Sequence, residues 1–255
     1  MWALVTGASS GIGRDMARYL YGLGYNLIIV ARDLSKLEEL KAELEQNNKK
    51  QEIIVIAKDL SSKENCIEIY NQTKNIELDL LVNNAGFGTF GEFSKTDLEK
   101  EVNLINTNIT AVHILTKLYL QDMLKRNKGH ILNVASIAGM EPGPLMAAYY
   151  ASKAYVIRLS RAINKELKKE KSKVKISILC PGPVDTNFNN VANVAFKAPS
   201  MQSEKVAKYG IDKALKGKLI IIPGVLNKSV RFFSKIVPDC ILEEVAYHIQ
   251  RRKRK

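Results

Sequence analysis

Apolar and polar positions along the chain follow two patterns that alternate with each other. Short, nearly continuous runs of valine, isoleucine and leucine are typical of buried strands, and longer stretches with an apolar residue every three or four positions are typical of helices. Leu37, Leu40 and Leu44, for example, share one face of a predicted helix. The predicted strands are 2–6, 27–31, 53–57, 78–82, 130–134, 175–179 and 218–222, and the predicted helices are 12–23, 34–46, 63–74, 95–104, 107–126, 149–169 and 203–215.

Strands that take turns with helices predict an α/β fold, a doubly wound parallel sheet with helices on both faces. No linker-like stretch divides the 255 residues, so we expect a single domain over 1–255. Ligands of such sheets bind beyond the carboxyl ends of the strands, where the strand order reverses. The residues directly after each strand therefore carry the functional information.

A glycine-rich turn follows the first predicted strand, where residues 6–13 read TGASSGIG. Glycines allow a tight turn and a close approach of backbone to a phosphate, and the next helix points its free N–H groups to the same place. A glycine-rich turn alone is a weak signal, but its position between the first strand and the first helix favours a dinucleotide-binding site.

The second predicted strand ends at Ala31 and is followed by Arg32. Folds that bind NAD usually place an acidic residue at this point for the ribose 2′-hydroxyl, whereas a cation suits the 2′-phosphate of NADP. The sequence therefore favours NADP(H), although Asp33 lies close by. Arg14, in the first helix, either adds a second positive charge for this phosphate or is an ordinary surface arginine.

Two further strand ends carry polar residues. Asp59, followed by Leu60, either accepts a hydrogen bond from an adenine amino group or begins the next helix as its N-cap. After the fourth strand, residues 83–86 read NNAG. The paired amides can hold neighbouring strand ends together and line the cofactor, and the glycine lets backbone come close.

The candidate chemistry lies at the fifth strand and on the long helix after it. Tyr149 and Lys153 are four residues apart, so they share a helix face, and Ser136 ends the fifth strand. The Lys153 ammonium and the positive nicotinamide of an oxidised cofactor are expected to lower the pKa of the Tyr149 phenol, about 10 in water, toward neutrality. Ser136 would donate to the carbonyl oxygen where charge develops. Asn108 would hold a water that connects Lys153 to solvent. Tyr150 is the alternative acid if the register is one residue off, but only Tyr149 stands four residues before Lys153.

Together with the segment PGPVDT at 181–186, these motifs resemble the short-chain dehydrogenase/reductase family in order and spacing, from residue 1 to about 222. The resemblance implies a Rossmann-like parallel sheet of about seven strands and a catalytic tetrad of Asn108, Ser136, Tyr149 and Lys153. It also implies an enzyme of the NADP-preferring, single-domain branch that moves a hydride between NADP(H) and a carbonyl or secondary alcohol. The cofactor contacts expected from the strand ends and the resemblance are Gly7, Ser9, Ser10, Gly11, Ile12, Gly13, Arg32, Asp59, Leu60, Asn84, Ala85, Gly86, Tyr149, Lys153, Pro181, Gly182, Val184 and Thr186.

The substrate is expected to be an apolar ketone, acyl or steroid-like compound. Residues 187–202, which are rich in apolar side chains, are the expected lid over it. Gly139, Met140, Pro142 and 145–146 are the expected opposite wall. A non-catalytic NADP-binding sensor or scaffold is the competing function. Members of this family that have lost activity usually lack the tyrosine or the lysine. Because Tyr149 and Lys153 are both present, we favour an enzyme.

The last part of the chain, 223–255, is expected to be a helical extension that ends in the basic tail 251–255. Its apolar positions Val230, Phe233 and Ile236 suit a packed lid or a subunit contact, and a peripheral membrane contact is the less favoured alternative. In the family that this sequence resembles, the helices that correspond to 107–126 and 149–169 pair with their copies in a second subunit across a two-fold axis. The resemblance therefore predicts a homodimer or homotetramer.

Composition bears on the cellular setting. The net charge is +13, but no basic patch is interleaved with aromatic residues, so no nucleic-acid partner is expected. Cys66, Cys180 and Cys240 are far apart, which predicts no disulfide framework and no metal centre and indicates a reducing compartment. No apolar run reaches about 18 residues, the length of a membrane span, and the first residues do not resemble a signal peptide. We therefore expect a cytoplasmic protein.

Overall fold

The structure is a computed structural model that describes residues 1–46, 50–186, 188, 200–224, 227–229 and 237–251. Within these residues, seven parallel strands form the central sheet in the order β3-β2-β1-β4-β5-β6-β9. The predicted α/β fold with a parallel sheet is confirmed. The strands are β1 (Trp2–Thr6), β2 (Asn26–Ala31), β3 (Ile53–Ala57), β4 (Leu78–Asn83), β5 (His130–Val134), β6 (Lys175–Leu179) and β9 (Ile220–Ile221).

The strand order reverses between β1 and β4. From β1 the chain builds outward through β2 to β3, and it then returns to the other side of β1 and continues through β4, β5, β6 and β9. The connections on the two sides leave the sheet in opposite directions, so a crevice opens at the carboxyl ends of β1 and β4.

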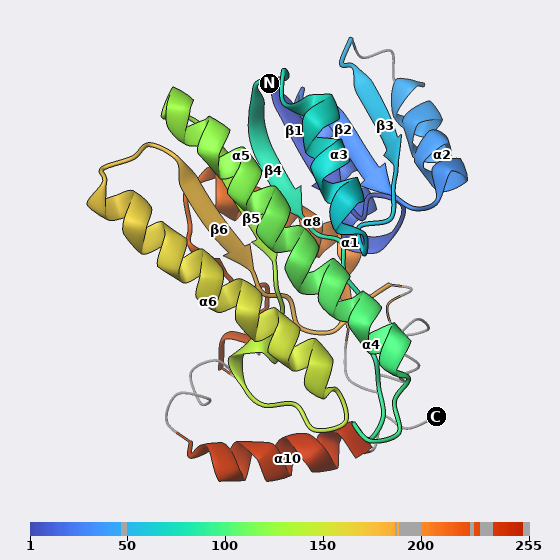
Figure 1. Cartoon of the computed structure of the whole chain (residues 1–255), viewed down its shortest axis with the longest axis vertical. Coiled ribbons are helices and arrows are strands. Elements are labelled where there is room, and N and C mark those ends of the chain that lie inside the picture. Colours follow the sequence, from blue (N-terminus) through green and yellow to red (C-terminus); the bar gives the residue numbers. More distant parts are fainter. Residues whose placement is uncertain (47–49, 187, 189–199, 225–226, 230–236, 252–255) are drawn as a thin grey trace.

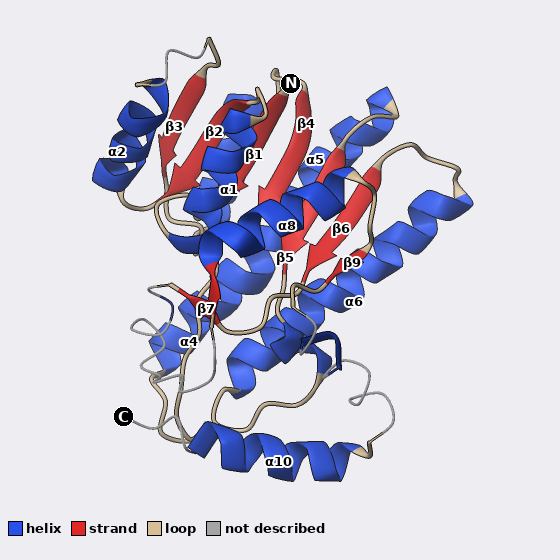
Figure 2. Cartoon of the chain, turned by 180° about the vertical axis from the view of Figure 1, so that it is seen from behind, coloured by secondary structure: helices blue, strands red, loops and turns tan. Residues whose placement is uncertain are grey.

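Helices cover both faces of the sheet (Figures 1 and 2). α3, α5 and α6 lie in front of it in Figure 1, and α1 and α8 lie in front of it in the opposite view of Figure 2. α2 packs on the side of α1, because its leucines join the buried cluster that contains Met16 and Leu20. The helices are α1 (Gly11–Gly22), α2 (Leu34–Glu45), α3 (Lys63–Thr73), α5 (Val112–Arg126), α6 (Ala147–Lys169) and α8 (Ser203–Leu215).

Burial from both faces explains the continuous apolar strands. Every residue of β5 is buried, and β2 is buried from Leu27 onward. A strand with one solvent-exposed face would alternate apolar and polar residues instead.

The predicted helices 95–104 and 107–126 form one continuous run. α4 (Leu98–Ile105) begins later than predicted because the Asp97 carboxylate caps it, accepting from Lys100 N at 2.7 Å. A π-helical turn, η1 (Asn106–Ala111), joins α4 to α5. Such turns are frequent at functional sites because the extra residue re-aims the side chains next to it.

The C-terminal third holds smaller elements. β7 (Val184–Asp185) pairs with β8 (Met201–Gln202), and the expected lid between them lies outside the described residues apart from Phe188 and 200–202. α10 (Asp239–Arg251) lies across the end of the molecule toward which the strands point (Figure 1). Val230, Phe233, Ile236 and 252–255 also lie outside the described residues. In the described part of the chain, no helix combines the length and the apolar character needed to span a bilayer.

Candidate active site

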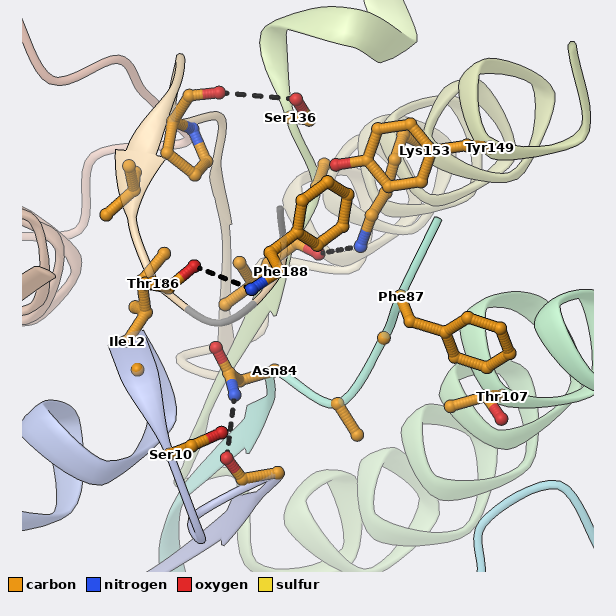
Figure 3. Close-up of a pocket in the computed structure, with 18 of the residues that line it drawn as sticks. Ser10, Ile12, Asn84, Phe87, Thr107, Ser136, Tyr149, Lys153, Thr186 and Phe188 are labelled. Atoms are coloured by element: carbon orange, nitrogen blue, oxygen red, sulfur yellow. Dashed lines mark hydrogen bonds between the residues drawn. The ribbon is translucent and has the colours of Figure 1, made fainter. Parts of the chain in front are cut away.

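A cavity lies beyond the carboxyl ends of the strands, at the reversal of strand order. Its walls come from the segments after β1 to β6, from the N-terminal part of α6 and from Gln250 of α10. Figure 3 shows residues of the strand ends and of α6 that line it. The predicted site residues that line it are Gly7, Ser9, Ser10, Gly11, Ile12, Arg32, Asp59, Leu60, Asn84, Ala85, Gly86, Ser136, Tyr149, Lys153, Pro181, Gly182, Val184 and Thr186.

The glycine-rich turn leads directly into α1. Gly7 and Gly11 have φ angles of +67° and +54°, which other residues rarely adopt. Ser10 precedes the helix in an extended conformation and makes no side-chain cap hydrogen bond. The Ser10 side chain therefore leaves the first N–H groups of α1 uncapped. These groups can donate hydrogen bonds to an anion bound at this end of the cavity.

Gly13 is a predicted cofactor contact that does not line the cavity. A Cβ on Gly13 would lie 2.3 Å from Gly7 O and 2.3 Å from Asn84 Nδ2. This glycine therefore lets α1 pack against the turn and does not face a ligand.

The two asparagines after β4 hold the strand ends together. Asn84 Nδ2 donates to Thr6 O at 3.0 Å, which ties the end of β4 to the glycine-rich turn. Asn83 Nδ2 donates to Thr116 Oγ1 at 3.0 Å and to Asn133 Oδ1 at 2.8 Å, which ties β4 to α5 and β5. The buried Asn83 and the half-buried Asn84 thus fix the relative positions of the segments that line the cavity.

Three cations line the outer end of the cavity: Arg32, Lys36 and Lys58. The Arg32 side chain is 73% exposed and its nearest ion-pair contact, Asp59 Oδ2, is 3.9 Å away. Asp33, whose proximity complicated the choice between NADP and NAD, caps α2 by accepting from Lys36 N at 3.1 Å. Its carboxylate is therefore engaged with the helix that follows.

Arg14 does not reach this cluster. Its Nη2 lies 3.1 Å from Glu39 Oε1 and 3.2 Å from Glu43 Oε2, and it does not line the cavity. Its charge is paired with α2, which favours the interpretation of Arg14 as an ordinary helix arginine.

Asp59 is not the N-cap of α3. Ser62 has that position, and its Oγ accepts from Asn65 N at 3.2 Å. Asp59 Oδ1 accepts from Ser61 N at 2.9 Å, while the residue lines the cavity. Of the two interpretations of Asp59, the N-cap is excluded.

Ser136, Tyr149 and Lys153 meet in the inner part of the cavity (Figure 3). Ser136 caps the 3₁₀ turn η2 (Ile137–Met140), and its Oγ accepts from Ala138 N at 3.1 Å and donates to Pro181 O at 3.3 Å. Gly139 lets this turn pack directly on α6, because a Cβ there would lie 2.5 Å from the Lys153 carbonyl carbon. The close packing brings Ser136 beside Tyr149 at the cavity.

The predicted lowering of the Tyr149 pKa is not found. Burial raises the pKa of Tyr149 to about 12, and the neighbouring Ser136 hydroxyl acts against this rise. Lys153 Nζ donates to Val134 O at 3.0 Å and lies 5.9 Å from the centre of the Tyr149 ring. Burial also lowers the pKa of Lys153 to about 8. Desolvation in this low-dielectric pocket is the main cause of both changes; at neutral pH the Tyr149 phenol therefore stays protonated, and Lys153 stays mostly charged although its proton is held less tightly than in water.

Asn108 lies behind the cavity wall, fully buried in the π-helical turn. Its Oδ1 accepts from Phe87 N at 3.1 Å, and its Nδ2 donates to Phe87 O at 2.9 Å and to Ser152 Oγ at 3.0 Å. It thus holds the segment after β4 against α6. Both amide hydrogens are used, so only an oxygen of this residue can accept from a water, and the predicted water stays a prediction.

The substrate end of the cavity has aromatic and apolar walls. Phe188 lies with its ring centre 5.2 Å from that of Tyr149 (Figure 3), and Phe87 and Met146 also face the cavity. Met146 is the one residue of the predicted opposite wall that lines it. The sequence did not predict the other residues of this wall. They are Ile137 and Ala138 of the 3₁₀ turn, Glu141 directly after it, Tyr150 of α6 and Gln250 of α10.

The residues present fit a nicotinamide dinucleotide. The N–H groups at the start of α1 suit a diphosphate, and the cations at the outer end suit an adenosine phosphate. Gly86 leaves room beside the inner groups, because a Cβ there would lie 2.8 Å from Asn108 Oδ1 and 3.3 Å from Lys153 Nζ.

Comparison with known proteins decides the family, because a family model described as short chain dehydrogenase matches residues 1–196. The chain belongs to the short-chain dehydrogenase family. It is 33% identical over 217 residues to a very-long-chain 3-oxoacyl-CoA reductase of Anas platyrhynchos, covering 82% of this chain and 68% of that protein. It is 34% identical over 197 residues to the 17-beta-hydroxysteroid dehydrogenase type 3 of Rattus norvegicus, covering 76% and 63%. A short-chain dehydrogenase from Sphingobium yanoikuyae in complex with NADPH has a TM-score of 0.82 at 25% identity, covering 93% and 96%.

As a short-chain dehydrogenase, the protein is an oxidoreductase that uses NAD(P)(H) to interconvert carbonyl and alcohol groups. Sequence reasoning missed Lys36, Lys58 and Gln250 at its cavity. Lys36 lies in the first turn of α2, which begins two residues after Arg32, so a search for cations in the helix after the second strand would have found it. Gln250 is 100 residues from its partner Tyr150, and no local pattern connects them.

Proposed function

We propose that this short-chain dehydrogenase is an NADP(H)-dependent reductase of an apolar ketone, with 3-oxoacyl thioesters and steroid-like ketones as the substrate classes to test. The similarity to a 3-oxoacyl-CoA reductase and to a 17-beta-hydroxysteroid dehydrogenase supports these classes. The aromatic and apolar substrate end of the cavity supports them independently.

The preference for NADP rests on the outer end of the cavity. Arg32, Lys36 and Lys58 line the cavity there, the residue at the end of β2 is Ala31, and the Asp33 carboxylate caps α2. A guanidinium makes charge-assisted hydrogen bonds to a phosphate that it cannot make to a neutral hydroxyl. The NADPH-bound relative in the comparison supports this preference.

The inner groups have distinct parts in the reaction. NADP(H), when bound, supplies or accepts the hydride. In reduction, the Tyr149 hydroxyl donates its proton to the substrate carbonyl oxygen, and its pKa of about 12 means that it holds this proton at neutral pH. Ser136 donates a hydrogen bond to the same oxygen as negative charge develops there. Lys153, with a pKa of about 8, is mostly charged at neutral pH and stabilises the phenolate left by Tyr149.

One observation carries the proposal. Ser136, Tyr149 and Lys153 line the same cavity as the glycine-rich turn and the three cations Arg32, Lys36 and Lys58. A screen of 3-oxoacyl thioesters, steroid ketones and simple ketones, followed by NADPH absorbance, tests it. We expect turnover of at least one apolar ketone with NADPH, and less with NADH. A protein that binds NADPH and reduces none of them would contradict the proposed activity.

We also propose that the protein is a homodimer or homotetramer. Val102 and Ile105 of α4 are 41% and 42% exposed next to the start of α5, and an interface through α4, α5 and α6 would bury them. Light scattering at micromolar concentration should give a mass of two or four chains, and the mass of one chain would contradict the proposal. A cytoplasmic location stays a prediction from the three free cysteines.

A further inference from the structure

Exposed apolar side chains of α10 form a stripe along one side of the helix. Ile241, Val245 and Ile249 follow one another at intervals of four residues, so they share a face, and each is about half exposed. Gln250 of the same helix is buried. A surface helix usually turns its apolar face to the protein and its polar residues to water. In α10 this order is partly inverted, which indicates that the apolar stripe meets another surface.

The position of α10 leaves the stripe open to a large partner. Among the elements that the structure describes, α10 is the outermost at the end of the molecule toward which the strands point (Figures 1 and 2). The loop between β4 and α4 comes to the C-terminal end of α10 in both views. This loop carries Phe93, whose side chain is 71% exposed. Large apolar side chains are therefore exposed on two separate segments at this end.

Cations follow the stripe directly in the chain. Arg251 ends α10, and the next four residues, 252–255, are all lysine or arginine. The carboxylates of α10 are at other positions than the stripe: Asp239, Glu243 and Glu244. An apolar helix face next to a group of cations has the two features that bind a membrane surface. The apolar side chains enter the boundary between headgroups and acyl chains, and the cations attract anionic lipids.

A second copy of the chain fits the stripe less well than a lipid surface does. Each partner in a stable protein interface usually buries about 800 Å² and contributes about 20 to 30 residues. The three half-exposed side chains of the stripe supply only a small part of such an interface. A lipid surface needs no matching shape, and its negative charge is complementary to the basic residues 251–255.

We propose that α10 and the basic tail 251–255 dock the protein on an anionic lipid bilayer, with Ile241, Val245 and Ile249 in contact with the lipid. Because α10 lies at the substrate end of the cavity, docking holds this end close to the bilayer, in which apolar compounds dissolve. The inference concerns attachment alone and does not depend on the proposed reductase function.

Flotation of the full chain with lipid vesicles tests the inference. The vesicles are made of phosphatidylcholine alone, or of phosphatidylcholine with about 30% phosphatidylglycerol as the anionic lipid. We expect the wild-type protein to bind the anionic vesicles at least tenfold more tightly than the neutral ones, and to lose this binding as the salt concentration rises. The salt dependence reports the contribution of the basic tail.

Two variants separate the contributions of the stripe and the tail. Val245→Asp should weaken binding to the anionic vesicles at least tenfold, because a charge replaces an apolar side chain in the contact. Leu23→Asp is its matched control. Leu23 is 43% exposed at the end of α1, at the opposite end of the sheet from α10, so the same change of charge should leave binding unaltered. Lys253→Gln combined with Lys255→Gln should weaken binding about fivefold for each cation removed, without altering α10.

The remaining outcomes overturn the inference. They are a wild-type protein that binds neither kind of vesicle or binds both equally, and binding that survives in Val245→Asp or falls as far in Leu23→Asp. Light scattering without lipid tests the competing partner. A mass that is lower for Val245→Asp than for the wild type would assign the stripe to a contact between copies of this chain and exclude the lipid contact. Retained NADPH binding shows that each variant is folded, and the comparison of the two vesicles with the wild-type protein needs no variant.

Discussion

The two ends of the cavity are built in different ways. The cofactor end consists of short segments that directly follow β1 to β4, so each residue is placed by the strand before it. The substrate end brings together Phe87, Met146, Phe188 and Gln250, which come from four separate parts of the chain. The first end is fixed by the sheet and the second by contacts between distant segments. Changes at the cofactor end should therefore alter cofactor choice, and changes at the substrate end should alter substrate choice.

The largest effect is expected where the two ends meet. Tyr149→Phe removes one hydroxyl and little volume, so the fold should persist while the proton donor is lost. Turnover should fall by about 10²- to 10⁴-fold, the usual contribution of a positioned acid. Steady-state kinetics with NADPH and a substrate found in the screen measure this loss, and NADPH binding followed by fluorescence should be retained. Near-normal turnover would contradict the role of Tyr149.

Lys153 makes a pH-dependent contribution to stability. The folded protein releases its proton near pH 8, and the unfolded chain releases it near 10.5. Between these values the unfolded state binds more protons, so the free energy of unfolding should rise with pH in this window. Between pH 8 and pH 10 the rise should amount to about 2 kcal/mol relative to Lys153→Met, in which the titrating group is absent. Urea denaturation of both proteins at pH 8 and pH 10 measures the difference, and parallel profiles would show that Lys153 is not desolvated.

Arg32 tests the cofactor end alone. The wild-type protein should prefer NADPH to NADH by about ten- to hundredfold, because charge-assisted bonds to a phosphate are absent with NADH. Arg32→Asp should abolish or reverse this preference with little change in the KM of the ketone. Titration of both cofactors measures the preference. Arg14→Ala is the matched control, and it should leave the preference in place because Arg14 pairs with Glu39 and Glu43.

Tyr150 tests the substrate end and should give the smallest effect. Tyr150→Phe keeps the ring on Gly143 but removes the partner of Gln250. We expect a change of only a few-fold in kcat/KM, about the value of one neutral hydrogen bond, with the cofactor preference unchanged. A loss as large as that of Tyr149→Phe would show that the wrong tyrosine of the pair has been assigned as the acid.

The sequence predicts the cofactor end better than the substrate end for a physical reason. Strand runs and the residues that follow them are adjacent in the chain, so a local pattern places Arg32, Asp59 and Asn84 near one another once the sheet is parallel. The pairing of Gln250 with Tyr150 depends on the docking of α10, to which no local pattern points.

Electrostatic properties were harder to predict than positions. Spacing placed Tyr149 and Lys153 on one helix face, and the structure does bring both to the cavity. The sign of the Tyr149 pKa change was wrong, because spacing does not report burial or the bond from Lys153 to the Val134 carbonyl. The role of Arg14 stayed open in the sequence, since its partners lie on a different helix.

Transfer of an isotope tests the central claim most directly. The protein would be incubated with NADPH that carries deuterium at the transferable position of C4, and with the N-acetylcysteamine thioester of 3-oxohexanoate. We predict that mass spectrometry will find one deuterium on the carbinol carbon of the product, and that the product will be almost absent with Tyr149→Phe. An alcohol product without deuterium, or equal product from Tyr149→Phe, would contradict the assignment of this cavity as the site of hydride transfer.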